Sequence, residues 1–338
     1  MGYYVGIDLH SNNNYIGIID QENRRVFKKK TINNLSEIAK TLYPYKEKIQ
    51  GIVVESTFNW YWIVDGLMEA GYKVHLANPS AIKQYEGLKY TDDTWDSFWL
   101  AHLLRLGILP EGHIYPKETR PIRDLLRKRL MLVHHKTAHI LSMQSMVSRN
   151  KGIQMDGNAI KAMKAKELSG LFTDEHLLMT ASCNYQVINF LSKQIVKIEK
   201  TVLGKVKLQE TYKKLLTVPG VGKILAITIM LETGNINRFR EVGNYSSYCR
   251  CVSSANFSNG KKKGKGNKKN GNRYLAWAYI EASLFARRYS QEAQRWYQRK
   301  ISKSNRIVAA KALSNKLARA CCYIMRDQVP YDPVKIFQ

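Results

Sequence analysis

The order of strand and helix patterns over the first 77 residues constrains the fold of this chain more than any other feature. Three strand-like runs come first, joined by polar turns, at residues 3–9 (YYVGIDL), 14–20 (NYIGIID) and 24–31. Such a series is typical of an antiparallel meander. Helical patterns and apolar strands then alternate, at residues 35–45, 51–55, 58–70 and 73–77. This order predicts a mixed α/β sheet.

Acidic residues end two of the expected strands. Asp8 follows YYVGI, and Glu55 follows GIVV. In a sheet of the ribonuclease-H type, which this order of elements favours, both carboxylates would project from the carboxyl edge. Open α/β folds place their chemistry at that edge. Taken alone, each acid is more often a strand-end cap than a functional group.

Three more acids stand at the start of the next helical pattern, which runs from about residue 94 to 107. Asp93 and Asp96 are three residues apart and share one helical face, and Asp92 precedes them. Asp92 and Asp93 could also serve as N-caps. Two edge acids plus an acid pair suit two hard divalent ions, with Mg²⁺ preferred, as used in phosphodiester chemistry. A metal site built from Asp8, Glu55, Asp93 and Asp96 is therefore predicted.

The charge of the chain indicates a polyanionic partner. Among 338 residues, 54 are Lys or Arg and 27 are Asp or Glu, a formal net charge of +27. Nucleic acid is the favoured partner rather than a membrane surface. No segment has about 18 uninterrupted apolar residues, so no membrane span is expected. The five cysteines form no CxxC pair, which is typical of reduced thiols in a cytoplasmic protein.

The middle of the chain is charge-laced and helical. Residues 119–149 and 185–216 are expected to form long arms that pack as a coiled coil, with short helices and turns over residues 150–184. The stretch LLTVPGVGKILAITIMLE predicts a helix-hairpin-helix, in which Gly220 and Gly222 expose backbone N–H groups to a phosphate. A plain turn between two helices is the alternative. Further helices are expected at 274–300 and 305–327, with an irregular tail.

A basic, glycine-rich segment, SNGKKKGKGNKKNGNR, occupies residues 258–273. It is too polar to build a core, and a flexible loop that grips phosphates is predicted. A solvated surface loop is the alternative. The aromatic residues Tyr274 and Trp277 are expected to be core, with base stacking as the minority interpretation. The expected phosphate-binding residues are Lys261, Lys262, Lys263, Lys265, Lys268, Lys269 and Arg273.

The runs GIDLH, VVEST and TDDTWDSFWLAHLLRLGILPEG resemble the DEDD RuvC-like domain of insertion-sequence family one hundred and ten, which includes bridge-RNA-guided recombinases. The runs VPGVGKILAITIMLETGNINRF and KKNGNRYLAWAYIEA resemble that family's C-terminal transposase domain. The resemblance implies an α/β RuvC/ribonuclease-H-like domain (1–118), a helical coiled-coil region (119–214), a mainly α transposase domain with a helix-hairpin-helix and a basic loop (215–330), and a tail (331–338).

The resemblance also implies roles for single residues. Asp8, Glu55, Asp93 and Asp96 match the family's metal-binding acids, and Ser258 matches its nucleophilic serine. Asn259 separates this serine from the glycine that follows it directly in many relatives, so Ser253 and Ser254 stay open as alternatives.

The implied activity is that of a bacterial or archaeal transposase acting at the nucleoid. It would cut and rejoin double-stranded donor and target DNA through a covalent phosphoserine intermediate, using Mg²⁺ or alternatively Mn²⁺. A non-coding bridge RNA would guide a dimer or tetramer. Because the acids and the serine are more than 160 residues apart, two domains would have to meet, within one chain or across a dimer. A metal-dependent structure-specific endonuclease, like a junction resolvase, is the alternative, and a non-catalytic nucleic-acid-binding protein is the third.

Overall fold

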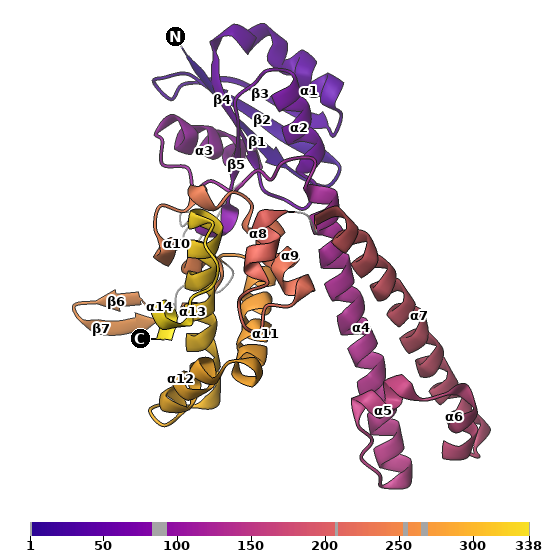
Figure 1. The fold of residues 1–338 in the computed structure, drawn as a ribbon. Helices are drawn as coiled ribbons and strands as arrows, with labels where there is room; N and C mark the ends of the chain where they lie inside the picture. Colours follow the sequence, from indigo (N-terminus) through magenta and orange to yellow (C-terminus); the bar gives the residue numbers. More distant parts are fainter. Residues whose placement is uncertain (1, 83–92, 207–208, 253–255, 265–269, 338) are drawn as a thin grey trace. The chain divides into compact units, whose positions relative to one another are not determined.

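The computed structural model describes residues 2–82, 93–206, 209–252, 256–264 and 270–337 (Figure 1). The chain forms two compact units, which are described separately. The first comprises Met1–Lys117 and Asn267–Asn270, and the second comprises Glu118–Gly266 and Gly271–Gln338. Within the described residues, no helix combines the length and the apolar character that crossing a membrane requires.

The first unit is built on a five-stranded mixed sheet, as the sequence predicts (Figure 1). The sheet order is β3-β2-β1-β4-β5; β1 pairs antiparallel with β2 and parallel with β4. The strands β2 and β3 form the rest of the meander, and β5 continues the parallel half. The strands are β1 (Tyr3–Leu9), β2 (Asn13–Ile19), β3 (Arg25–Ile32), β4 (Ile49–Glu55) and β5 (Val74–Ala77).

Successive side chains of β1 and β4 point to opposite faces of the sheet, and helices cover both faces. Val5, Ile7 and Leu9 pack in one buried cluster with residues of α1 (Leu35–Leu42) and α2 (Tyr61–Glu69). The intervening positions, including Gly6 and Asp8, point to the other face, which α3 (Asp93–Arg105) covers. Because Asp8 lies on the face that carries α3, the sheet brings it toward the acids of that helix. Short 3₁₀ helices occur at Tyr43–Lys48 and Pro79–Ala81.

Two glycines let α3 approach the sheet closely. Gly6 and Gly17 pair across β1 and β2. A Cβ atom on Gly6 would lie 1.8 Å from the Ser97 carbonyl oxygen, and one on Gly17 would lie 2.7 Å from the Ser97 hydroxyl. Any side chain here would push the helix outward, so this glycine pair sets the distance between α3 and the face of the sheet.

Two long antiparallel helices, α4 (Arg120–Lys151) and α7 (Glu175–Val206), form an arm of the second unit (Figure 1). An Arg129–Glu199 ion pair of 2.7 Å and a His139–Asn184 contact of 2.9 Å join them. The short helices α5 (Gly157–Ala162) and α6 (Ala165–Leu171) complete a core at the far end of the arm.

The paired arms are confirmed, but the second begins ten residues earlier than predicted. The Asp174 carboxylate starts α7 by accepting hydrogen bonds from the N–H groups of His176 and Leu177. The predicted continuation to residue 216 is wrong, because residues 210–215 form a separate helix, α8 (Glu210–Leu215).

The remaining helices share one large buried core with the bases of α4 and α7. The single helix expected at 274–300 is two helices, because Ser290 has an extended backbone and caps the second by accepting a hydrogen bond from the Ala293 N–H group. The tail expected to be irregular contains α14 (Pro333–Phe337). The helices are α9 (Lys223–Thr233), α10 (Val242–Tyr248), α11 (Arg273–Tyr289), α12 (Gln291–Ile301) and α13 (Arg306–Asp327), with a 3₁₀ turn at Ile236–Arg238.

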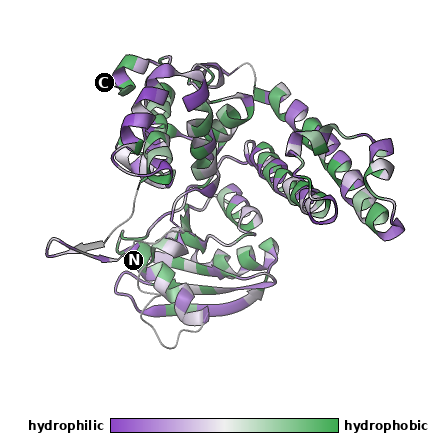
Figure 2. Ribbon diagram, turned by 90° about the horizontal axis from the view of Figure 1, so that it is seen from below, coloured by the Kyte–Doolittle hydropathy of each residue, from purple (hydrophilic) through white to green (hydrophobic). Residues whose placement is uncertain are grey.

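Part of the basic segment is a β-hairpin rather than a flexible loop. Strand β6 (Asn256–Ser258) pairs antiparallel with β7 (Lys261–Gly264), and hydrophilic residues dominate it (left in Figure 2). Asn259 and Gly260 both have positive φ angles, 49° and 69°. Two such residues between paired strands make a type I′ turn, for which Asn-Gly is the preferred sequence. The dipeptide therefore explains why this polar segment is ordered into strands.

Candidate active site

Asp8 and Glu55 are neighbours at the carboxyl edge of the sheet. Ile7 pairs with Val54 across the parallel strands β1 and β4, so the next residue of each strand is an acid. Asp8 is only 3% exposed. Burial, a hydrogen bond with Asp8, and the charges of Asp8 and Asp96 together raise the pKa of Glu55 to about 8. Carboxyl groups this close keep a proton between them unless a cation balances their charge.

The first turn of α3 adds the other two predicted acids. The charge of Asp96 acts on Glu55, and Asp93 Oδ1 lies 3.5 Å from the ring of His10. The structure therefore brings Asp8, Glu55, Asp93 and Asp96 near one another in the first unit, and their role as metal ligands stays a prediction. Asp92 lies outside the described residues.

His10 belongs to this cluster although the sequence analysis passed over it. Its Nε2 atom lies 3.0 Å from Asp8 Oδ2, yet neither atom makes an aligned hydrogen bond within the described residues. One ligand atom each from Asp8, His10 and Asp93 fall within 4.8 Å of one another. The available signal was the run GIDLH, because residues two apart at a strand end point to the same side.

This donor set fits a divalent cation. Two carboxylates and an imidazole nitrogen converge, and the lack of an aligned hydrogen bond at Asp8 Oδ2 and His10 Nε2 calls for an explanation such as an ion. The raised pKa of Glu55 is consistent with a cation site, because neighbouring carboxylates repel one another and a metal ion would neutralise their charge. We call Asp8, Glu55, Asp93, Asp96 and His10 the acid cluster.

The predicted nucleophile lies in the second unit. Ser258 is exposed, ends β6 and faces Lys261 across the hairpin. Lys261 and Lys263 are exposed, and Lys262 lies between them in β7. Arg273 is an exposed residue at the start of α11 and donates a hydrogen bond to the Tyr274 hydroxyl. The other candidates Lys265, Lys268 and Lys269, and the alternatives Ser253 and Ser254, lie outside the described residues.

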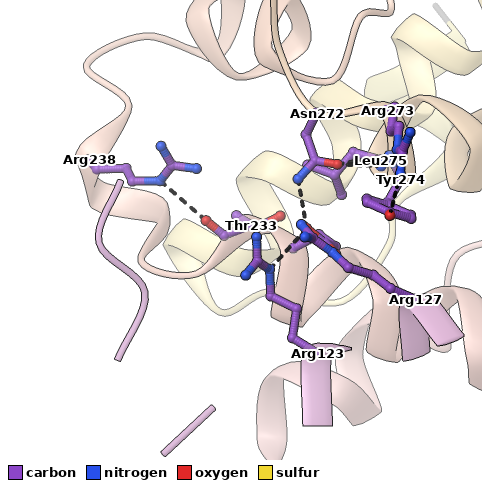
Figure 3. Close-up of polar contacts among 9 residues, drawn as sticks. Arg123, Arg127, Thr233, Arg238, Asn272, Arg273, Tyr274 and Leu275 are labelled. Atoms are coloured by element: carbon purple, nitrogen blue, oxygen red, sulfur yellow. Dashed lines mark hydrogen bonds and ion pairs between the residues drawn. The ribbon is translucent and has the colours of Figure 1, made fainter. Parts of the chain in front are cut away.

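A buried ion network holds the residue that follows the basic segment. Asn272 caps α11 by accepting hydrogen bonds from the N–H groups of Tyr274 and Leu275. Its amide donates to Glu232 of α9 at 2.7 Å, and the guanidinium groups of Arg123 and Arg127 reach the same carboxylate from α4 (Figure 3). The network therefore joins the base of the arm to the C-terminal end of the basic segment.

Sequence reasoning missed this network. Its one signal was Glu232, the single acid in the apolar run KILAITIMLE, since a charge in such a run needs a buried partner.

The helix-hairpin-helix forms from α8, the VPGVG turn and α9. A Cβ atom on Gly220 would lie 2.2 Å from the carbonyl oxygen of Ala282 in α11, so Gly220 packs against that helix. Gly222 is exposed directly before α9, where helix N-terminal N–H groups attract phosphate. DNA contact by these glycines stays a prediction, with Gly222 the better placed of the two.

Family models match both units. Residues 5–151 match the model of the DEDD transposases, and residues 212–298 match that of the Transposase IS116/IS110/IS902 family. The first match contains all four acids, and the second contains Ser258, Glu232 and Asn272. The chain belongs to this transposase family.

Two curated relatives align over most of the transposase. One is described as the transposase for insertion sequence element IS1328 of Yersinia enterocolitica, 21% identical over 330 residues, covering 93% of this chain and 94% of the relative. The other is described as a probable family 20 transposase of Pseudomonas aeruginosa, 22% identical over 285 residues, covering 81% and 82%. A transposase acts on DNA, and its DEDD domain indicates use of a divalent metal.

Proposed function

We propose that this transposase cuts and rejoins DNA strands through a covalent link to Ser258, that the acid cluster assists with Mg²⁺ or Mn²⁺, and that a bridge RNA guides it. The observation that carries this proposal is the convergence of Asp8, Glu55, Asp93 and Asp96 at one sheet edge. The strand order of the first unit supports a ribonuclease-H, RuvC-like domain.

Within the acid cluster, Asp8 and Asp93 would hold a cation with His10, and Glu55 and Asp96 would complete the oxygen ligands. When bound, a divalent metal supplies Lewis-acid stabilisation of the charge that develops on the attacking and leaving oxygens. Glu55 would then give up its proton.

In the proposed step, the Oγ atom of Ser258 bonds to the phosphorus and the bond from phosphorus to the 3′-oxygen breaks. One proton leaves the serine hydroxyl and one reaches the 3′-oxygen, which departs as a hydroxyl. Attack by a new 3′-hydroxyl on the phosphoserine reverses the step and rejoins a strand. Lys261, opposite Ser258 in the hairpin, supplies positive charge where the phosphate gains negative charge.

Because Ser258 and the acid cluster lie in different units, the proposed chemistry requires the two to meet on the DNA, within one chain or across a dimer. Mixing an Asp8→Asn chain with a Ser258→Ala chain distinguishes these arrangements. Restored recombination would establish a shared site between protomers, and none is expected if one chain supplies the whole site.

The covalent step is tested by incubating the protein with labelled target DNA and Mg²⁺, then running a denaturing gel. The wild type should give a protein–DNA band that Ser258→Ala lacks while it still binds DNA. Ser253→Ala and Ser254→Ala are matched controls that should keep the band. If Ser253→Ala or Ser254→Ala loses the band instead, the substituted serine is the nucleophile. Cleavage by the wild type without any adduct would favour a metal-dependent endonuclease in which water attacks.

RNA guidance and assembly are separate parts of the proposal. Protein purified free of RNA should recombine DNA only after a transcript of the DNA that flanks its gene is added. Light scattering should give the mass of a dimer or tetramer. Full activity of RNA-free protein on defined donor and target sites would contradict guidance.

A further inference from the structure

A row of polar side chains crosses four adjacent strands of the sheet and ends in the acid cluster. Lys30 of β3 pairs with Tyr15 of β2, and Tyr15 pairs with Asp8 of β1. Glu55 of β4 is the neighbour on the other side of Asp8. Because directly paired residues point to the same face of a sheet, Lys30 and Tyr15 lie on the face that carries the acids and α3.

The lysines of the edge strand β3 divide between the two faces of the sheet. Lys28 pairs with Gly17, which α3 approaches closely, so Lys28 shares the face of Lys30. These two lysines are two residues apart, about 6.6 Å along the strand. Lys29 lies between them on the opposite face, where its ammonium group donates a hydrogen bond to the Thr41 hydroxyl of α1.

Lys30 carries its charge beside the acid cluster. Its Nζ atom lies 5.1 Å from the centre of the Tyr15 ring, and that ring meets the His10 ring edge-on at 5.8 Å. Hydrogen bonding to Tyr15 and the charge of Asp93 both raise the pKa of Lys30, so the ammonium group stays protonated near the acids.

The two lysines on this face are available for a partner. Both side chains are exposed, and within the part of the chain that the structure describes neither Lys28 nor Lys30 forms an ion pair with a carboxylate. The neighbouring carboxylates repel an approaching phosphate before a metal neutralises them. Cations on the same face offset that repulsion and attract nucleic acid.

We propose that Lys28 and Lys30 form a phosphate track, on the α3 face of β3, that leads a DNA strand to the acid cluster. Lys30 is two strands away from Asp8, about 10 Å, so it contacts a phosphate next to the one that is cut, and Lys28 contacts the following one. Lysine binds phosphate as a point charge, so the track holds the strand without reading its sequence. This inference rests on the proposed action of the acid cluster on DNA.

The test measures binding of full-length Ser258→Ala protein to a labelled DNA duplex over a range of salt concentrations, without divalent cations. Lys28→Ala and Lys30→Ala should each reduce the log–log salt slope by about 0.9, and the double variant by about 1.8. Lys30→Arg keeps the charge and should keep the slope. Lys29→Ala is the matched control, because it removes the same charge from the opposite face, and it should leave the slope unchanged.

Three results would overturn the proposal. They are an unchanged slope in the double variant, an equal loss of slope in Lys29→Ala, and a loss of slope for an RNA transcript of the flanking DNA but not for DNA itself.

The place of the contact is tested in the denaturing-gel assay with Mg²⁺. Target DNA carries a single neutral methylphosphonate, moved through the positions around the cut. At one position beside the cut, the neutral group should slow adduct formation by the wild type but not slow Lys30→Ala further. Equal slowing of both proteins at every position would contradict the contact. If the wild type forms no adduct, the covalent mechanism fails, and the salt slopes alone decide whether the track binds DNA.

Discussion

Replacing Glu232 by alanine removes the carboxylate on which α4 and the end of the basic segment converge. Glu232 is 2% exposed, and its oxygens lie 3.1 Å from Arg123 Nε and 2.6 Å from Arg127 Nε. The Arg123 side chain is 8% exposed, so water cannot readily replace the lost carboxylate, whereas Arg127 at 27% can be partly hydrated. Removing one partner of a buried pair costs about 3–5 kcal/mol.

That loss should be visible as an earlier melting transition of the second unit. For a unit of roughly 200 residues, 1 kcal/mol shifts Tm by about 2–4 °C, so the expected drop is roughly 6–20 °C. Glu199→Ala is the matched control, because Glu199 also pairs with an α4 arginine but its side chain is 28% exposed. Because water partly reaches this pair, its contribution is smaller, about 1 kcal/mol.

The pH dependence of stability provides a second readout. Burial alone would raise the pKa of Glu232, but hydrogen bonds and charges from Arg127, Arg123 and Asn272 outweigh it and the pKa is lowered. The stabilisation by the Glu232 carboxylate is therefore fully present above the pKa of this group in the unfolded chain, about 4.5. It is lost as pH falls through the lower pKa of the folded protein. Glu232→Gln should lose this acid-side slope. Equal melting of wild type and Glu232→Ala, or equal effects of Glu232→Ala and Glu199→Ala, would refute the reasoning.

Three further changes test other parts of the molecule. Mg²⁺ or Mn²⁺ should raise the melting temperature of the wild type but not of Asp8→Asn in calorimetry, because ligands bound only by the native state stabilise it; an equal shift in both would place the metal elsewhere. Gly6→Ala should destabilise the first unit by about 3 kcal/mol in urea titrations, since its Cβ meets the Ser97 carbonyl oxygen, whereas Gly170→Ala, in open space, should be harmless. Alanine at Lys261 and Lys263 should weaken binding to all DNA sequences alike and reduce the log–log salt slope by about one per lost contact, and a change of sequence preference alone would count against phosphate binding.

Local patterns determined much of this protein in advance. Hydrophobic alternation located the five strands, helical spacing located the arms, and acids at strand ends located Asp8 and Glu55. These features depend on neighbours in the chain, which is why the sequence alone reveals them. The hairpin at residues 256–264 was open to the same reasoning through its Asn-Gly turn, but charge and glycine content suggested a loop instead.

Tertiary structure alone decided which distant residues meet. The parallel pairing of β1 with β4 makes Asp8 and Glu55 neighbours, and the glycine-lined approach of α3 adds Asp93 and Asp96. The Glu232 network joins residues more than 100 positions apart, from α4, α9 and the start of α11. No local period encodes such contacts, because they depend on which faces the packed helices and strands turn toward one another. The sequence by itself therefore determined the kinds of residue available for chemistry, and packing decided the partners that tune and hold them.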